Sequence, residues 1–599
     1  MPTMAGGGDR LSGLSDDLLR RILHFVPAQE GAFTSVLSRR WRPLWRSCGA
    51  VNLEARALKG SHDDRYCKEA RGRFFARRDA VVSAAHKALD TAAAAEADGD
   101  GPVRKLTFRV EAHTEDEVRD FLHRDVAWRD KHDVFAGVLS HRAARRLEEL
   151  QIAAVDSDDG KPMHFETSKY EASGNIHGLG IFPLAVGSLP SKTLRVLEIT
   201  NCSKLEPASP PVFFPRLESL RLRHCNMPLN NLQDIIDAAP LLAIIHLDSI
   251  LLEYDEKRHG NGRRDSRRDN APPPEQDRLN RSLRCRTAIS LVMDRCSFKE
   301  EGTLQIYAPM LRRFRYRGVL RHISLSPPPL HLARAELTLT EYGYLRHRDP
   351  RVARQSFWGT VRGFIHAKEM KLKVRHLEEI ATTNEKRQAK LLPVLPSLER
   401  LHLQGVYTAP GNMSAAAIEN LLRCCPALRD LRIDLSTSQE DAKRKFQYGQ
   451  DFLERKHRSE FEESVQRFKR RRTQPMVGAG DDDDGHVNYF DEVSDLPGLS
   501  GHSFECLRKC LRRVGLQFQR QTTDCFGTKL VKFFAQDAKV LEELCIDAGN
   551  ERIHDHMKLK VEKWVAHLSS TKRRRINSIG ATKLQVLSLP RSYIWEELV

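Results

Sequence analysis

The sequence has no apolar run long enough to cross a membrane. The segment LLAIIHL at 241–247 is typical of its longest apolar stretches, whereas a spanning helix needs roughly 18 such residues. The N-terminal stretch MPTMAGGGDRLSG has neither the basic region nor the apolar core of a secretory signal. With a mean hydropathy of −0.50 and 30% charged residues, we expect a soluble protein of the cytoplasm or nucleus, with no membrane partner.

Cysteine is sparse, with 12 residues in a chain of 599. Without a secretory signal these are expected to be reduced thiols. Neither Cys506 and Cys510, nor Cys424–Cys425, has the paired CxxC spacing of a zinc site, and His554 and His556 stand alone. We therefore expect no metal ion. Buried free cysteine acts as a small hydrophobe, which is the role expected after strand-like runs for Cys202, Cys225 and Cys296.

Catalytic motifs are also missing from the sequence. It contains no GxxxxGK[ST] loop, no HExxH, no GxSxG and no GxGxxG. The pair Gly178 and Gly180 lacks a third glycine, and the adjacent acids Asp481–Asp484 do not converge as an EF-hand does. We expect a protein that is not an enzyme and takes no cofactor.

The net charge of +17 and the isoelectric point near 9.4 raise nucleic acid as a partner. The basic clusters Lys469–Arg472 and Lys572–Arg575 are local, however, and acidic residues are interspersed elsewhere. These clusters are open to three interpretations, namely nuclear import signals, nucleic-acid contacts or solvated surface. Nucleic acid is therefore not expected to be the main partner.

The first recognisable feature of the chain is a short amphipathic segment after Asp9. Ser15 is placed to cap a helix, with Asp16 and Asp17 favouring its positive end, although no Glu or Gln follows three residues later to complete a capping box. Apolar residues recur at helical spacing up to Val26, and Pro27 is expected to end the helix. Leu14 and Leu19 are placed to form a hydrophobic staple around the cap.

A second helical stretch is expected to follow, with Val36, Leu37 and Trp41 among its apolar residues. Pro43 is expected to kink or end it near Arg42. Two helices in fewer than forty residues cannot bury a core of their own, so part of their apolar surface is expected to face a partner or the next domain.

This segment resembles the F-box, in the form that opens many plant F-box proteins with leucine-rich repeats. The residues that match are LSxL, DDLLxxIL, FVP and TSxLSRRWRxLW, in the family's order and spacing. The family usually has proline where this chain has Ser15, which is a reason to measure partner affinity. The alternative is a helical hairpin that closes the end of the next domain.

The resemblance implies docking onto a Skp-family adaptor, and through it onto a cullin-based ubiquitin ligase. Some of the same residues must also hold the helices to one another, and the sequence does not separate the two sets. The implied adaptor-binding residues are Leu14, Ser15, Leu18, Leu19, Ile22, Leu23, Val26, Val36, Leu37 and Trp41.

A short phrase, Leu-x-x-Leu-x-Leu/Ile, then recurs along the chain. Leu197 and Leu220 are one step apart, as are Leu401 and Leu431, and these steps bracket the period of leucine-rich repeats. Alternating apolar residues give a strand one buried face. The clear copies lie at 194–202, 217–225, 398–406, 428–436, 541–549 and 584–592, and weaker ones at 104–110, 147–153, 241–249, 286–296 and 335–341.

Two stretches show a whole repeat unit. Residues 417–435 place a helix face of Ile418, Leu421 and Leu422 before Pro426 and the next strand, and residues 228–247 repeat this order with Pro240. This resembles the irregular repeats of plant F-box proteins and predicts an α/β solenoid. A third resemblance, at 506–550, is to the FBD domain at the C-terminus of such proteins, with a strand at 514–518 and a helix at 529–538; a terminal cap is its simplest role.

Three stretches interrupt this pattern. Residues 91–101 predict a short helix that runs into a turn, and 256–278 combine charges of both signs with glycine and three prolines. The longest interruption, from about Thr437 to Asp495, contains a charged stretch at 451–472 that is expected to be helical.

The sequence thus predicts an α/β protein with an N-terminal helical F-box followed by an irregular leucine-rich-repeat solenoid and disordered insertions. The expected parts are an F-box at 9–50, a solenoid at 51–440 with a disordered insertion at about 255–278, a charged insertion at 437–498, and an FBD-like region with terminal repeats at 499–599.

The expected function is that of a non-catalytic subunit of an SCF-type ubiquitin ligase. The F-box would hold the adaptor while the repeats bind an unknown target protein. Two alternatives stay open: an adaptor-bound scaffold or nuclear regulator that acts outside ubiquitination, and a basic nucleic-acid-binding repeat protein.

Overall fold

The structure is a computed structural model, and it divides into two compact units, residues 1–311 and 312–599, each of which is treated by itself. The described residues are 13–57, 68–97, 102–124, 132–158, 160, 180–208, 210–253, 282–298, 304–319, 323–340, 350–408, 411–436, 493–518, 525–547, 557–565 and 584–588. Among these residues, no helix is both long enough and apolar enough to pass through a bilayer. The insertion at 256–278, the stretch at 451–472, the acids 481–484, the pair His554 and His556, and the basic clusters 469–472 and 572–575 lie outside them.

The first unit begins with three short helices, α1 (Asp16–Leu23), α2 (Ala28–Leu37) and α3 (Trp41–Arg46). Ser15 is the N-cap residue of α1, as expected, but its side chain makes no capping hydrogen bond. The expectation that α1 continues to Pro27 was wrong, because the helix ends at Leu23 and Pro27 begins α2 instead.

The position of Pro43 also corrects the sequence prediction. The expected second helix is two helices, α2 and α3, separated at Ser38, and Pro43 is the third residue of α3 rather than a break. A proline is tolerated in the first turn because its missing N–H would have no intrahelical partner there.

The helix expected within 91–101 is the end of a much longer one, α4 (Lys68–Ala97). Phe74, Phe75, Ala85 and Leu89 form its buried side, and the alanine-rich C-terminal half has high helix propensity. It packs against β1 and α3 in the first unit.

A parallel sheet follows in the first unit, and its strands adjoin in nearly the order of the chain. In spatial order these strands are β1 (Ala50–Arg56), β2 (Lys105–Ala112), β3 (Glu149–Asp156), β5 (Val196–Thr200), β7 (Ser219–Arg223), β9 (Ile244–Asp248) and β12 (Ser290–Asp294).

The strand register places the leucines of the recurring phrase in rows. Leu197 pairs with Leu220, and the same buried row continues through Ile245 to Leu291. Because side chains alternate between the two faces of a strand, each copy of the phrase contributes two buried residues to adjacent rows. Stacked rows of this kind form the core of the unit.

The chain turns sharply after four successive strands of this sheet. Asn201, His224, Ser249 and Arg295 follow β5, β7, β9 and β12 directly, and each has a positive φ, between 51° and 68°. The next residue is buried in each case, and in three of them it is the cysteine predicted to fill the core: Cys202, Cys225 and Cys296. That prediction is confirmed.

A second layer of short strands and helices lies beyond these turns in the first unit. The helices here include α5 (Glu115–His123), α6 (Val134–Leu139) and α7 (Leu229–Asp237). The short strands are β4 (Phe182–Ala185), β6 (Cys202–Glu206), β8 (Asn226–Pro228), β10 (Leu251–Glu253), β11 (Ser282–Arg284), β13 (Ser297–Phe298) and β14 (Leu304–Tyr307).

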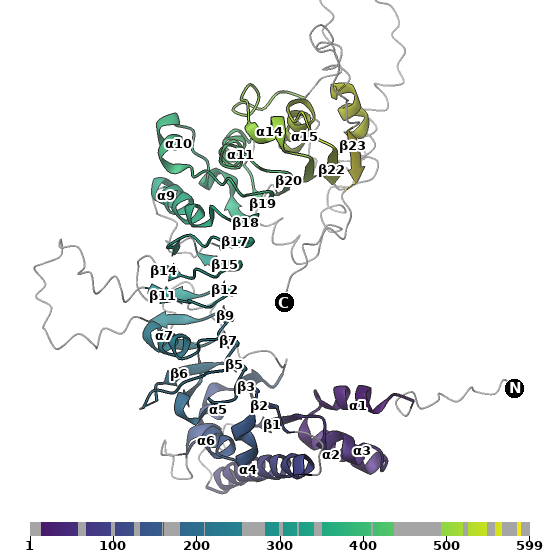
Figure 1. Ribbon diagram of the computed structural model, residues 1–599, viewed down its shortest axis with the longest axis vertical. Helices are drawn as coiled ribbons and strands as arrows, with labels where there is room; N and C mark the ends of the chain where they lie inside the picture. Colours follow the sequence, from purple (N-terminus) through teal and green to yellow (C-terminus); the bar gives the residue numbers. More distant parts are fainter. Residues whose placement is uncertain are drawn as a thin grey trace, which may run out of the picture. The chain divides into compact units, whose positions relative to one another are not determined.

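The second unit contains a parallel sheet of the same kind, with helices α9, α10 and α11 beside its strands (Figure 1). Its strands are, in spatial order, β15 (Arg313–Val319), β17 (Arg334–Thr340), β18 (Glu369–His376), β19 (Arg400–Val406), β20 (Asp430–Ser436), β21 (Arg513–Gln517), β22 (Glu543–Asp547) and β23 (Gln585–Ser588). The short strand β16 (Ile323–Leu325) and the helices α9 (Pro350–Val361), α10 (Glu385–Leu391), α11 (Asn412–Cys424), α14 (Glu505–Lys509) and α15 (Phe526–Asp537) complete it.

Every copy of the recurring phrase contains a strand of one of the two sheets, so these strand predictions are confirmed. The helices predicted before Pro240 and Pro426, and the helix at 529–538, are also present, as α7, α11 and α15. The fold is therefore a helical N-terminal region followed by mixed α/β structure with a long parallel sheet in each unit.

Candidate functional site

Two of the N-terminal helices, α1 and α3, share a small apolar core. Leu19 and Leu23 of α1 lie four residues apart and meet Trp41 and Leu44 of α3, and all four side chains are buried. Leu14, Trp45 and Cys48 pack against this cluster. Burial raises the pKa of the Cys48 thiol, so this thiol stays protonated at neutral pH.

Other positions of this segment carry apolar side chains that are exposed to solvent. Leu18 and Ile22 of α1 are 48% and 41% exposed, and Val36 of α2 is 82% exposed. Phe25 and Phe33 are 69% and 62% exposed, and sequence analysis did not select them. The sequence contains one signal for them, because both phenylalanines lie close to apolar residues at helical spacing. Five exposed large apolar residues in so short a segment indicate a surface for a partner.

The structure therefore separates the ten residues predicted to bind the adaptor. Leu19, Leu23 and Trp41 are interior, Leu14 and Val26 are half-buried, and Leu18, Ile22, Val36 and Ser15 are exposed. The Leu37 side chain lies outside the described part of the chain. The adaptor-binding role of all ten remains a prediction.

Polar contacts fix the N-terminal end of α1. An Arg40 Nη2 atom lies 2.7 Å from an Asp16 carboxylate oxygen, and Arg40 also donates a hydrogen bond to the carbonyl oxygen of Leu14. Asp16 is in the first turn, where a carboxylate is favoured by the helix dipole. Arg40 follows α2, so this ion pair ties the start of α1 to the link between α2 and α3.

The C-terminal end of α1 is held by the first strand of the sheet. The side-chain amide of Asn52, on β1, donates hydrogen bonds to the carbonyl oxygens of His24 at 2.9 Å and Val26 at 3.0 Å. The His24 ring nitrogen Nδ1 lies 3.0 Å from the carbonyl oxygen of Cys48. The exposed row on α1 is thus presented by a helix fixed at both ends.

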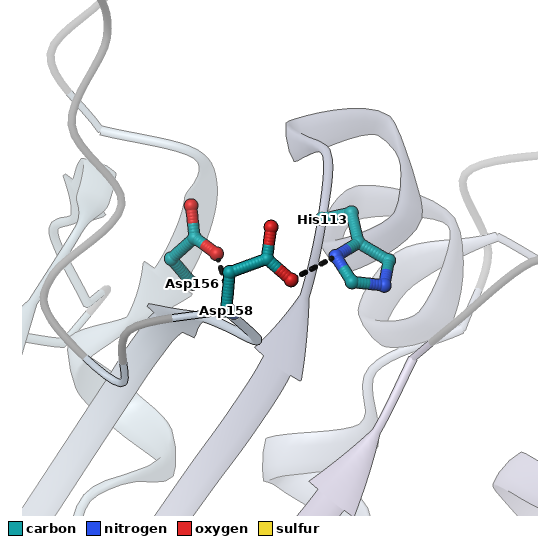
Figure 2. Close-up of side chains that lie close together, drawn as sticks. All are labelled: His113, Asp156 and Asp158. Atoms are coloured by element: carbon teal, nitrogen blue, oxygen red, sulfur yellow. Dashed lines mark hydrogen bonds and ion pairs between the residues drawn. The ribbon is translucent and has the colours of Figure 1, made fainter.

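Among the described residues, His113, Asp156 and Asp158 form a group that could hold a metal ion (Figure 2). Asp156 ends β3 and His113 follows β2, and the parallel register brings them together. Their ligand atoms lie within 4.8 Å of one another, and an imidazole nitrogen with two carboxylates suits a divalent cation.

The same atoms also satisfy one another without a ligand. His113 Nδ1 lies 3.3 Å from Asp158 Oδ1, and Asp156 Oδ1 accepts a hydrogen bond from the Asp158 backbone N–H at 2.8 Å. The Asp158 side chain is 81% exposed. We interpret the group as one that stabilises the turn after β3. Sequence analysis missed it, although polar residues at the ends of two adjacent parallel strands would have indicated it.

Comparisons with known proteins concern the N-terminal segment. Residues 11–50 match the family model of the F-box domain. An F-box/FBD/LRR-repeat protein of Arabidopsis thaliana is 53% identical over 47 residues, which are 8% of this chain and 10% of that protein. A putative FBD-associated F-box protein of the same plant is 52% identical over 46 residues, or 8% of this chain and 25% of that protein. An FBD-associated F-box protein is 44% identical over 61 residues, or 10% and 15%.

The chain thus spans between a tenth and a quarter of the length of these relatives. The family match covers the three helices α1, α2 and α3, which carry both the small core and the exposed apolar side chains. We conclude that residues 11–50 of this chain are an F-box domain.

Proposed function

We propose that this protein is the substrate receptor of an SCF-type cullin ubiquitin ligase. Residues 11–50 would bind a Skp-family adaptor, and the sheets would bind a target protein. The observation that carries this proposal is the exposure of Leu18 and Ile22 on α1 and of Val36 on α2, while Leu19, Leu23, Trp41 and Leu44 fill the small core. Apolar side chains of this kind supply the buried anchors of helix-packing interfaces.

Such a receptor contributes no catalytic group of its own. It would hold the target near the conjugating enzyme carried by the cullin and so raise the effective concentration of the target's lysines. The match to the F-box domain supports this role, because F-box proteins are typically non-catalytic receptors. An intracellular location in the cytoplasm or nucleus is part of the proposal.

The remainder of the chain is proposed to be an irregular leucine-rich-repeat solenoid at 51–440, a charged insertion at 437–498 and an FBD-like region at 499–599. In support, Leu197 pairs with Leu220 and Leu401 with Leu431, so that successive copies of one phrase lie side by side. The names of similar proteins, which include LRR-repeat and FBD, point the same way.

The test is adaptor retention by the full-length chain. The chain is co-expressed with a Skp-family adaptor. We expect the double variant Leu18→Asp/Ile22→Asp to retain at least ~10-fold less adaptor, because binding would bury the new aspartate carboxylates in the interface without a partner charge. The matched control is Ser83→Asp/Ala84→Asp, which places the same charges on exposed positions of α4. Failure of the unaltered chain to retain the adaptor would refute the proposal.

A second measurement distinguishes a substrate receptor from an adaptor-bound scaffold. In cells that express the Leu18→Asp/Ile22→Asp variant, the target should accumulate relative to cells with the α4 control, as measured by quantitative proteomics. If the adaptor binds the unaltered chain but no bound protein accumulates in the variant cells, the scaffold role replaces the receptor role.

A further inference from the structure

Positive charge is concentrated on one part of the second unit's sheet. Because side chains alternate along a strand, the residues between the buried ones on β15, β17 and β18 face away from the core. Up to Lys373, after which the register of β18 with its neighbour becomes irregular, six of these outward residues are basic, two are acidic and one is neutral: Arg313, Arg315, Arg317, Arg334, Glu336, Thr338, Glu369, Lys371 and Lys373.

The register aligns these side chains in rows across the three strands. Arg317 pairs with Thr338 and Thr338 with Lys373, so one row has two cations and no carboxylate. The neighbouring row runs from Arg315 through Glu336 to Lys371. Since adjacent strands lie about 4.8 Å apart, the backbone positions of the two cations in a row, with one strand between them, are about 10 Å from each other.

The two acidic residues are already engaged by arginines. Glu336 lies 3.9 Å from Arg315 and also pairs with Arg334, and Glu369 pairs with Arg400 of the next strand. Their negative charge is therefore largely offset within the sheet. The outward side chains named above thus carry six cations against two carboxylates, which is an excess of positive charge at this part of the sheet.

The rest of the same sheet does not share this excess. On β19 to β22 the outward charged residues are three cations and four carboxylates: Arg400, Arg432, Arg513, Asp430, Asp434, Glu543 and Asp547. The positive charge thus belongs to a particular place on the sheet, and it is not simply the overall charge of the chain.

We propose that the basic patch, defined as Arg313, Arg315, Arg317, Arg334, Lys371 and Lys373, binds an acidic polypeptide segment of the target protein. This inference rests on the proposed receptor function and names the chemistry of its target. Most of these side chains are half-buried, where a charge is less screened than on open surface and contributes more to partner selection.

A peptide suits the patch better than a nucleic acid does. Single-stranded nucleic acids bind where aromatic side chains offer stacking platforms, and the aromatic residues of β15, Phe314 and Tyr316, are buried in the core.

The probe is a fluorescein-labelled peptide of six Asp-Ser repeats, with an Asn-Ser peptide of equal length and a dodecathymidylate for comparison. Binding to the full-length chain with its adaptor is measured by fluorescence anisotropy. We expect Arg317→Glu/Lys371→Glu/Lys373→Glu to weaken acidic-peptide binding by ~10-fold or more, and added salt to weaken binding to the unaltered protein.

The matched control is Lys386→Glu/Arg387→Glu/Lys390→Glu, which makes the same change in net charge at exposed positions of α10 in the same unit. It should change the affinity by less than ~2-fold. The milder Lys371→Gln/Lys373→Gln serves if the triple variant does not fold, and it should weaken binding by a smaller factor.

Three results would overturn the proposal. One is an equal loss of acidic-peptide affinity in the α10 control, which would show that binding depends on the overall charge of the protein. Another is dodecathymidylate binding as tight as peptide binding and lost in the patch variant, which would make the patch a nucleic-acid site. The third is no preference for Asp-Ser over Asn-Ser. Adaptor retention, measured on the same samples, reports separately on the proposed receptor function.

Discussion

The side-chain amide of Asn52 donates a hydrogen bond to the carbonyl oxygen of Val26 at 3.0 Å. Its second N–H is bound by the carbonyl oxygen of His24, and the side chain is 9% exposed. Asn52 lies on the first strand of the sheet and Val26 in the turn after α1. A buried amide thus joins the F-box helices to the sheet in the first unit, which would suit the proposed receptor, whose target would have to be held at a defined distance from the ligase.

Replacing Asn52 with alanine should loosen this junction. The two carbonyl groups would lose their donor, at a cost of about 1–3 kcal/mol. We expect faster amide hydrogen exchange in α1 and a lower urea midpoint. Thr107→Ala, on the adjacent strand, is the control, because its hydroxyl makes only a long 3.4 Å contact with Gln151. Equal exchange rates in the two variants would show that the junction does not depend on Asn52.

Two adjacent leucines of α1 should respond differently to truncation. Leu19 is fully buried, so Leu19→Ala should cost about 2–5 kcal/mol through lost burial and a cavity. Leu18 is 48% exposed, so Leu18→Ala should change unfolding free energy by less than about 0.5 kcal/mol while lowering adaptor affinity. Chemical unfolding and adaptor titration of both variants check this. A Leu18→Ala variant that unfolds at a lower denaturant concentration but binds the adaptor normally would contradict the exposed, adaptor-binding role of Leu18.

Ser15 departs from the proline common in similar F-boxes, and the structure makes proline acceptable there. Ser15 has a φ of −67°, which a proline ring adopts without strain, and its hydroxyl makes no capping hydrogen bond. Ser15→Pro should therefore stabilise the segment by about 0.4–1 kcal/mol by restricting the unfolded chain. Ser15→Ala should change little, because no cap is lost. Thermal unfolding of both variants measures this, and a destabilised proline variant would contradict it.

The sheet was largely predictable because its determinant is local. Alternating Leu and Ile residues identify a buried strand face wherever they occur, and all copies of the phrase proved to be strands. The strands of the long sheets that sequence analysis missed are β1, β15 and β18, whose apolar residues do not form the recurring phrase. β15 buries Phe314 and Tyr316, and β18 buries Met370 and Leu372. A search for alternating apolar residues, without a requirement for the full phrase, would have found both β15 and β18.

The division of the F-box residues was not predictable, because it depends on contacts between distant positions. Leu18 and Leu19 look equivalent in the sequence, and only the packing of α3 against α1 makes Leu19 interior. The contacts that hold the two ends of α1 also come from distant positions, since Arg40 and Asn52 lie more than twenty residues from the atoms they bind. Periodicity identifies a helix with an apolar face but does not say what covers it.

One buried histidine gives the second unit a dependence on pH. His402 is 2% exposed, and its Nε2 lies 2.8 Å from Asp434 Oδ2, which also accepts a hydrogen bond from Gln404. Burial lowers the pKa of the His402 imidazole, although the hydrogen bond and charge of Asp434 act in the opposite direction. The Arg432 guanidinium, which pairs with Asp434, also disfavours the imidazolium. His402 is therefore neutral in the folded protein at neutral pH.

The sign of the pH effect follows from this neutrality. The unfolded chain binds a proton at His402 near pH 6.5 and the folded chain only at lower pH, so stability is complete above about pH 6.5 and falls as the pH drops towards the folded pKa. We expect the urea midpoint of the wild-type protein to be lower at pH 5.5 than at pH 7.5, as followed by intrinsic fluorescence. His402→Gln, which keeps a donor but cannot titrate, should reduce this difference, whereas His331→Gln at an exposed position should preserve it. A wild-type protein that becomes more stable at pH 5.5, with the gain abolished by His402→Gln, would show instead that the charge of Asp434 outweighs burial.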